Sequence, residues 1–261
     1  MRLFILIICS FLVSSLHAQS DYKVIKVSGS ILYVRTGSSM AQGDIFPEDE
    51  DLDFATPNSR AAVINPEKGR FILSSGPQNQ VSRAKTNFLP AMSNISTRGG
   101  ALNNLTDIQN QFSGQVSILY SASWHINPYQ FPMNEETFFY IQYLYKGERI
   151  NKKLPFMGNN LIFSREDILK VDDNPIEKPD TPNAIFYYYG KNGAQYISAF
   201  ELVFPDLVEL AAETSIIIEE SVDDSYNRMV NELSGYIYEF YGKPDKQDVM
   251  QFMAKDLELK K

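Results

Sequence analysis

Apolar and polar residues alternate along positions 22–74, and turn residues interrupt the alternation at short intervals. The stretch YKVIKVSGSILYVRTG alternates on both sides of a turn at Ser28-Gly29, and SRAAVINPEKGRFILSS places two apolar runs around a turn at Pro66–Gly69. Alternation marks strands that bury one face, and turns this close together join neighbouring strands. We therefore expect a small antiparallel β domain in this part of the chain.

A second β-rich pattern covers residues 113–204 and contains many aromatic residues. The stretch ETFFYIQYLYKGERINKKL has a turn at Lys146-Gly147, and GQVSILYSAS is also strand-like. The strongest hairpin signal is AIFYYYGKNGAQYISAFELVF, where two aromatic strands flank Asn192-Gly193. The intervening VDDNPIEKPDTPNA is rich in Pro and Asp and is expected to form a loop.

The aromatic stretch FYYYG has two interpretations. Because successive side chains of a strand point to opposite faces, Phe186 and Tyr188 lie on one face and Tyr187 and Tyr189 on the other. In the first interpretation the exposed row of tyrosines binds a peptide or a glycan. In the second, which we favour, the C-terminal helices bury one face of the sheet and ordinary tyrosines lie outside.

The pattern becomes helical toward the C-terminus. Asp223 or Asp224 can cap the start of a helix over 223–241, and Gly242 with Pro244 ends it. The apolar residues of this segment recur at three- and four-residue steps: Tyr226, Met229, Val230, Leu233, Ile237, Phe240 and Tyr241. A stripe this apolar requires a packing partner.

We expect this helix to dock on the face of the sheet that contains residues 185–204, with Leu233 and Ile237 at the centre of the contact. A shorter helix is expected from Asp245, and an earlier one from Asp206. Helices gathered at one end of a mainly antiparallel sheet define an α+β fold. The expected organisation is a signal peptide over 1–18, a β domain over 19–76, a linker over 77–112, and an α+β domain over 113–261.

The predicted linker is rich in Ser, Asn, Gln and Gly, and it can carry one short helix with Leu102, Leu105, Ile108 and Phe112. The N-terminal segment MRLFILIICSFLVSSLHAQS has one positive residue, an apolar run and small residues ending at Ala18. This order is typical of a secretory signal peptide, and the run is too short for a membrane span of about 20 residues. No later segment is apolar enough for a membrane helix, so we expect an exported, soluble protein in the periplasm or another extracytoplasmic space.

Composition narrows the possible chemistry. Cleavage after Ala18 removes the single Cys and one of the two His, so His125 remains alone. The mature chain therefore cannot contain a thiol nucleophile, a disulfide, a Cys-based zinc site or a His cluster. The formal net charge is −8 and there is no dense Lys/Arg block. Binding to nucleic acid or to an anionic membrane is therefore unfavourable. We expect no cofactor.

Two features invite a site interpretation. The stretch PEDEDLD over 47–53 contains five carboxylates. It forms either a solvated turn or a weak cation site. We favour the turn, because an extended chain points alternate carboxylates to opposite sides, whereas a cation needs oxygens that converge on one point. His125 beside Trp124 is interpreted as a packing or hydrogen-bonding residue, since a hydrolytic triad needs partners that no motif supplies. The sequence predicts no catalytic, cofactor-binding or metal-binding residue.

The stretch VIKVSGSILYVRTGSSMAQGDIFPEDEDLDFATPNSRAAVINPEKGRFILSS resembles the FecR-type extracytoplasmic module. The matching positions are Gly29, Val34, Arg35, Gly43, Asp44, Leu52, Thr56, Ser59, Ala61, Val63, Gly69, Ile72 and Leu73. In that family the module is a β-rich domain outside the inner membrane, in sensors that regulate sigma factors. This chain departs from the family because it lacks the transmembrane helix and the cytoplasmic anti-sigma segment of such sensors.

Signal peptide, resemblance and composition together favour an exported, non-enzymatic binding or scaffold/regulatory protein of the cell envelope. Its partner is expected to be an envelope protein or a small ligand. Two alternatives stay open, namely an exported hydrolase that uses carboxylates and an accessory subunit of an exported enzyme. Paired carboxylates are common in this acidic chain, and none is singled out for catalysis.

Overall fold

The computed structural model describes residues 21–75, 86–91, 101–221 and 225–259, so the predicted signal peptide and the middle of the predicted linker lie outside the described residues. The chain divides into two compact units, Met1–Pro90 (unit 1) and Ala91–Lys261 (unit 2). Antiparallel strands dominate both units, and three consecutive helices follow the last strand of unit 2. The α+β fold is therefore confirmed.

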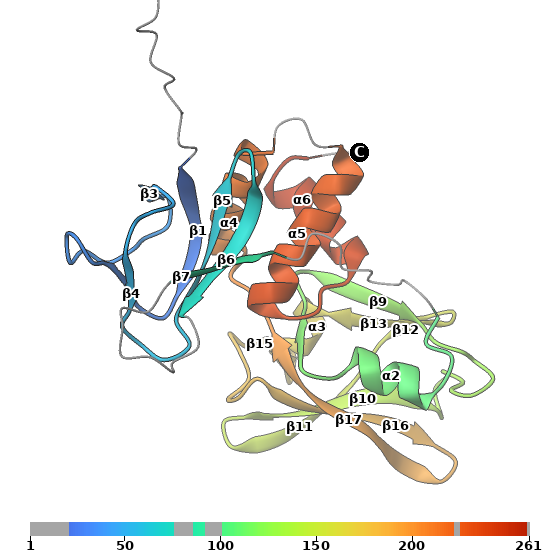
Figure 1. Ribbon diagram of the computed structural model, residues 1–261. Coiled ribbons are helices and arrows are strands. Elements are labelled where there is room, and N and C mark those ends of the chain that lie inside the picture. The colour runs from blue at the N-terminus through green and yellow to red at the C-terminus, as the bar shows by residue number, and fades with distance from the viewer. Residues whose placement is uncertain (1–20, 76–85, 92–100, 222–224, 260–261) are drawn as a thin grey trace, which may run out of the picture. The chain divides into compact units, whose positions relative to one another are not determined.

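Unit 1 is a five-stranded sheet accompanied by a separate strand pair (Figure 1). The sheet has the order β3-β1-β5-β6-β7, from β1 (Tyr22–Ser28), β3 (Ile45–Phe46), β5 (Arg60–Asn65), β6 (Gly69–Ser75) and β7 (Thr86–Pro90). The pair is β2 (Ile31–Tyr33) with β4 (Leu52–Phe54). The expected turn at Pro66–Gly69 joins β5 to β6, while a bulge in β1 buries both Val24 and Ile25.

The turn after β1 requires the residues found at three positions of the FecR resemblance, Gly29, Thr56 and Ser59. Gly29 has φ of +81°, and a Cβ there would lie 2.6 Å from Ser59 Oγ, so only glycine fits. The next amide, of Ser30, donates to Thr56 Oγ1 at 3.0 Å and to Ser59 Oγ at 3.1 Å. The two hydroxyls also contact each other at 2.7 Å. These residues fix the passage of the chain from the sheet to the β2–β4 pair.

Unit 2 is built on a five-stranded sheet of order β11-β10-β16-β17-β8. Its strands are β8 (Gln115–Ser117), β10 (Phe138–Tyr145), β11 (Glu148–Lys153), β16 (Asn183–Gly190) and β17 (Gly193–Val203). The expected turns at Lys146-Gly147 and before Gly193 join β10 to β11 and β16 to β17. β8 pairs in parallel with β17, while the other pairings are antiparallel.

A second, three-stranded sheet and five helices complete unit 2. The sheet has the order β12-β13-β9, from β9 (Ser121–His125), β12 (Phe156–Met157) and β13 (Asn160–Ser164), and a small pair joins β14 (Lys170–Val171) to β15 (Asn174–Pro175). The helices are α2 (Leu105–Gln111), α3 (Arg165–Ile168), α4 (Leu207–Glu219), α5 (Tyr226–Tyr241) and α6 (Lys246–Asp256).

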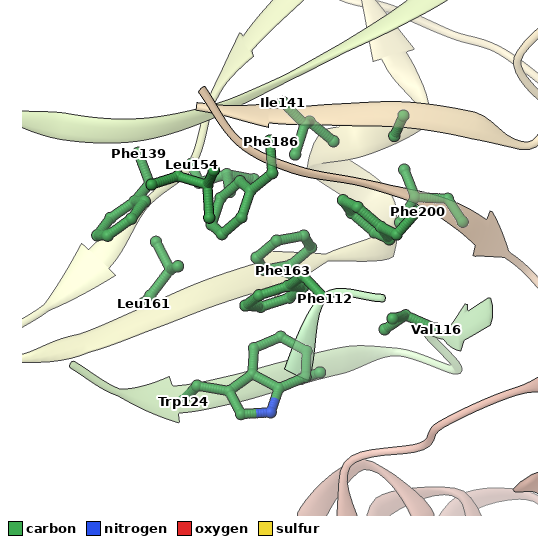
Figure 2. Packing of buried hydrophobic residues seen from close by; sticks show 14 of the residues in the cluster. Phe112, Val116, Trp124, Phe139, Ile141, Leu154, Leu161, Phe163, Phe186 and Phe200 are labelled. Carbon is green, nitrogen blue, oxygen red and sulfur yellow. The ribbon is translucent and has the colours of Figure 1, made fainter. Parts of the chain in front are cut away.

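The main core of unit 2 lies between the two sheets and is strongly aromatic (Figure 2). Phe112, at the end of α2, lies at its centre, with ring centroids 4.9 Å from Trp124, 5.0 Å from Phe163 and 4.6 Å from Phe186. The predicted linker is thus wrong at its C-terminal end, because α2 and Phe112 belong to this core. The sequence pattern had placed an apolar stripe there but could not show which domain it joins.

The expected docking of the C-terminal helix is also wrong in its location. Leu233 and Ile237 are fully buried, but α5 packs against α6, α4 and β8, at the edge of the main sheet. The face that contains Phe186 is covered by the second sheet and α2 instead, and no described residue of α4, α5 or α6 belongs to that core. The cap of α5 is Ser225, whose hydroxyl accepts from Arg228 N, and not an aspartate.

Other predicted helix boundaries are confirmed. Asp206 caps α4 and Asp245 caps α6, each through side-chain acceptance of two backbone amides. Gly242 ends α5 with φ of +96°, and a Cβ there would lie 2.5 Å from Gln115 Cβ. The glycine lets the chain pass so close that Lys243 N donates to Gln115 O at 2.8 Å and Ser117 N donates to Lys243 O at 3.0 Å.

Candidate functional site

Five aromatic side chains lie on the open face of the main sheet of unit 2, and we call them the aromatic face. They are Phe138 and Tyr140 of β10, Tyr187 and Tyr189 of β16, and Tyr196 of β17. Strand alternation places them opposite the buried Phe139 and Phe186. Within unit 2, the second sheet and the described helices lie on the other side of β10, β16 and β17 (Figure 1). Tyr189 and Tyr196 are therefore 43% and 55% exposed.

The rings of the aromatic face are ordered by direct cross-strand pairing. Tyr140 and Tyr187 are register partners, with centroids 5.0 Å apart and ring planes 11° apart. Phe138 and Tyr189 are also partners, at 5.2 Å and 23°. Parallel rings this close cannot lie side by side in one plane, so they stack and stand upright on the sheet. The upright pairs turn ring edges and phenol hydroxyls toward solvent.

Tyr196 extends this array across the third strand. It is the register partner of Tyr187, and the two rings meet edge to face, at 6.1 Å and 81°. Partial burial raises the pKa of Tyr140, and the neighbouring Tyr187 raises it further. The Tyr140 phenol therefore stays neutral at physiological pH and can donate a hydrogen bond.

One border of the aromatic face is polar. Lys153, the register partner of Tyr140, has its Nζ 4.6 Å from the centre of the Phe138 ring and 2.9 Å from Glu135 Oε2. Gln142 Nε2 donates to Asn151 Oδ1 at 2.8 Å in the next row. An open hollow of about 450 Å³ adjoins the same end of β11, lined by Glu135, Lys152, Lys153, Leu154, Pro155, Phe156 and Asp167.

This arrangement is suited to binding rather than to bond making. Tyr and Phe provide large contact areas with few rotatable bonds, and they are enriched at the centres of protein interfaces. Stacking within the sheet fixes these rings further, so little side-chain entropy remains to be lost on association. The ring faces are already occupied by each other, which disfavours a sugar stacked flat on them and favours a partner that packs on edges and accepts from hydroxyls.

The buried carboxylates of unit 2 have structural partners. Asp248 is fully buried, and its carboxylate accepts from the backbone amides of Leu119 at 2.7 Å, Tyr120 at 2.8 Å and Ser121 at 2.9 Å. Burial raises its pKa, and these three hydrogen bonds oppose the rise. Burial also raises the pKa of the α6 cap, Asp245, to about 6.

A further buried carboxylate lies between α4 and α5. Glu213 Oε2 accepts from the hydroxyls of Tyr236 and Tyr241, each at 2.7 Å. Burial and this carboxylate together raise the pKa of Tyr241 far above its ordinary value. The group joins two helices.

The acidic stretch 47–53 is a turn with two external ion pairs. Glu48 binds Lys68, and Glu50 Oε2 lies 3.1 Å from Arg35 Nη2. Asp51 and Asp53 flank Leu52 and are exposed. Over the described ranges, no three side chains of the His, Cys, Asp and Glu types come close enough to hold a metal ion. The geometry thus favours a solvated turn in which basic side chains pair with two of the five carboxylates.

His125 is an exposed residue of β9, with Nδ1 3.2 Å from Asn160 Oδ1 on the paired strand β13. Its neighbour Trp124 points the other way into the core. The sequence had singled out Tyr187 and Tyr189, but not Phe138, Tyr140 and Tyr196. Alternation in FFYIQYLY contained that signal, whereas the pairing of β10 with β16, which brings the rings together, is non-local.

Comparison with known proteins finds no matching family model, no matching curated protein and no matching solved structure. In the part of the chain that the structure describes, no helix has the length and apolar character needed to cross a membrane. The resemblance of residues 24–75 to the FecR-type module stays a prediction.

Proposed function

We propose that this chain is an exported, non-enzymatic binding or scaffold protein of the cell envelope, with a FecR-like module, and that its aromatic face binds a partner protein. The observation that carries the proposal is the contact of five aromatic rings on the open side of one sheet. A lone exposed tyrosine is ordinary, but a contiguous exposed aromatic patch marks an interaction site. The second interpretation of FYYYG, with ordinary tyrosines outside, is the less favoured one on this evidence.

Two further observations support binding over hydrolysis. The buried carboxylates Asp248 and Glu213 and the partly buried Asp245 each accept hydrogen bonds from helix or loop groups of the same fold. The raised pKa values of Asp248 and Asp245 follow from their removal from solvent and need no catalytic explanation. The alternatives of a carboxylate-dependent hydrolase and of an accessory subunit remain testable beside the proposal.

Site-specific photocrosslinking in the organism of origin tests the proposal directly. A photoreactive phenylalanine analogue at Tyr187 or Tyr196 should crosslink a discrete partner. The matched control is Tyr129, which is 96% exposed in a loop outside the aromatic face. Equal crosslinking from Tyr129 would mean that the capture is non-specific, and would count against the aromatic face.

The partner identified in this way should then be purified and titrated with the protein. Tyr187→Ala is expected to weaken binding at least tenfold, as for a residue near the centre of an interface, while Tyr129→Ala leaves the affinity unchanged. The hydrolase alternative is tested separately with peptide, ester and glycoside substrates. Reproducible turnover abolished by one Asp or Glu substitution would replace the binding proposal.

A further inference from the structure

The outer edge of β11 offers a second binding surface, distinct from the aromatic face. β11 is an end strand of the main sheet, since the strand order is β11-β10-β16-β17-β8. Its pairing with β10 continues without a register shift from Glu148 to Lys153, and the strand contains no proline. Bulges and prolines are common protections of edge strands, and β11 has neither.

The turn that precedes β11 determines which backbone groups point outward. Lys146 and Gly147 both have positive φ, and they form a two-residue connection between Tyr145 and Glu148. The residues that flank such a connection form a hydrogen-bonded pair. Glu148, Ile150 and Lys152 therefore direct their amide and carbonyl groups to β10.

Arg149, Asn151 and Lys153, in the alternate positions, direct their amide and carbonyl groups away from the sheet. Within the described residues, no backbone hydrogen bond occupies these outward groups. The turn is held in place because the Asp180 carboxylate accepts from Lys146 N at 2.8 Å and from Gly147 N at 2.7 Å. The edge is thus a preformed template for one more antiparallel or parallel strand.

The side chains of β11 select the charge of an added strand. Arg149, Lys152 and Lys153 are basic, and Glu148 is the single acidic residue. Arg149 is exposed and forms no ion pair with a described residue, so its charge is available to a ligand. A basic or neutral strand would leave the Arg149 charge unpaired. Carboxylates at alternate positions would lie opposite Arg149 and opposite Lys153, which already pairs with Glu135.

We propose that the outer edge of β11 binds an extended acidic peptide segment, which adds a sixth strand to the main sheet of unit 2. Affinity would come from main-chain hydrogen bonds to Arg149, Asn151 and Lys153, and selectivity from the basic side chains. The proposal goes beyond the aromatic face and does not depend on it, because the outward backbone groups lie at the sheet edge rather than on its open side. Two copies of β11 pairing with each other would bring an excess of positive charge together, which disfavours a second copy as occupant.

The test uses a short capped peptide of alternating Thr and Glu. Binding is measured by calorimetry, and residue-resolved amide exchange by NMR reports where the peptide docks. The amides of Arg149, Asn151 and Lys153 should become protected at least tenfold when the peptide is added. A peptide of alternating Thr and Lys should not bind, and added salt should weaken the acidic peptide because exposed charges are screened.

Two modifications remove the hydrogen bonds without changing the charges. Asn151→Pro deletes the central outward amide of β11, and N-methylation of alternate peptide residues deletes the matching donors of the ligand. Each should lower the affinity at least tenfold, while Tyr187→Ala, on the aromatic face, should leave it unchanged. If Asn151→Pro fails to fold, the N-methylated peptide makes the same test on the unaltered protein.

Three results would overturn the proposal. One is the absence of binding by the acidic peptide, and another is equal binding by its N-methylated form. The third is protection of the three amides in the protein alone, together with a dimer in sedimentation that Asn151→Pro dissociates. That result would identify a second copy as the occupant of the edge.

Discussion

The two faces of the main sheet in unit 2 use the same residue types in opposite ways. On the inner face, Phe139 and Phe186 are fully buried and contact each other, and Phe186 also contacts Phe112 at the end of α2 and Phe163 of the second sheet. On the outer face, Tyr140 and Tyr187 contact rings of their own sheet and remain partly exposed. β10 and β16 each supply residues to both sets, because side chains alternate between the two faces along a strand. Burial is therefore decided by the layer that covers a face, and not by the aromatic character of the strand.

The difference has a functional consequence. The inner rings meet mostly at tilted and edge-to-face angles in a closed cluster, so each is held by several others (Figure 2). The outer rings contact one another across the strands and remain partly exposed. The first arrangement stabilises the fold, and the second leaves contact area available for association. The following predictions test this division of roles.

The largest expected effect is on the inner face. Phe186→Ala removes a fully buried ring and should lower the free energy of unfolding by about 3–5 kcal/mol. Its neighbour Tyr187→Ala should cost about 1 kcal/mol or less, because the ring is partly solvated in the folded state. Urea unfolding followed by circular dichroism measures both. Equal losses for the two variants would remove the proposed difference between the faces.

Removal of a buried polar group should likewise cost more stability than removal of a solvent-accessible one. Asp248→Ala leaves three backbone amides of the 119–121 segment without their acceptor, and should lower the free energy of unfolding by about 2–4 kcal/mol. Gln142→Ala breaks a solvent-accessible pair with Asn151 and should cost about 0.5 kcal/mol. The comparison uses the same urea titration. A loss below about 1 kcal/mol for Asp248→Ala would mean that water satisfies those amides.

The partly buried cap of α6, Asp245, should make stability depend on pH. Asp245 has a pKa of about 6 in the folded protein, above the ordinary value, so the folded state holds the proton more tightly than the unfolded state. The stabilisation from tighter proton binding by Asp245 is complete below about pH 4. It is lost as the pH rises through about 6, and the total loss is at most about 3 kcal/mol. Asp245→Asn keeps a capping side chain but cannot titrate. The variant should therefore gain stability relative to the natural protein between pH 4 and pH 7.

Asp206→Asn is the matched control for this prediction, because Asp206 caps α4 with the same geometry but is exposed. Denaturant midpoints at several pH values measure the effect for both variants. Parallel profiles for the natural protein and Asp245→Asn would show that the cap does not titrate in this range.

The smallest effect concerns the coupling of the outer rings. A double-mutant cycle on Tyr140 and Tyr187 should give a coupling of about 0.5–1.5 kcal/mol, because the rings stack at 5.0 Å. Tyr140 and Tyr196 are separated by a strand. The effects of substituting them on the free energy of unfolding should therefore add to within about 0.5 kcal/mol. Chemical denaturation of the four proteins of each cycle provides the values. Coupling of the distant pair as strong as that of the stacked pair would contradict the paired arrangement.

The sequence revealed the local parts of this fold. Turn residues located the hairpins at Lys146-Gly147 and near Gly193, and capping residues located α4 and α6. These signals are local because a turn or a cap depends on a few neighbouring residues. Alternation also assigned Phe186 and Tyr187 to opposite faces correctly.

Non-local packing could not be predicted in the same way. Nothing near Phe186 indicates that β13 and α2 cover it, so the helices at the C-terminus were assigned to the wrong surface. The register that sets Tyr140 against Tyr187 joins strands far apart in the sequence, and many registers share the same alternation. The aromatic face therefore became evident only when three strands were seen side by side.

The hydrogen bonds that the backbone amides of residues 119–121 donate to Asp248 join segments that are synthesised at different times. Tyr120 and Asp248 are 128 residues apart, and at ordinary translation speeds on the order of 10 s separates their synthesis. The parallel bridge of Val116 with Lys243 imposes a similar delay. The connection between β8 and β9 thus waits for α6, and the amides of residues 119–121 lack their acceptor until that helix is made.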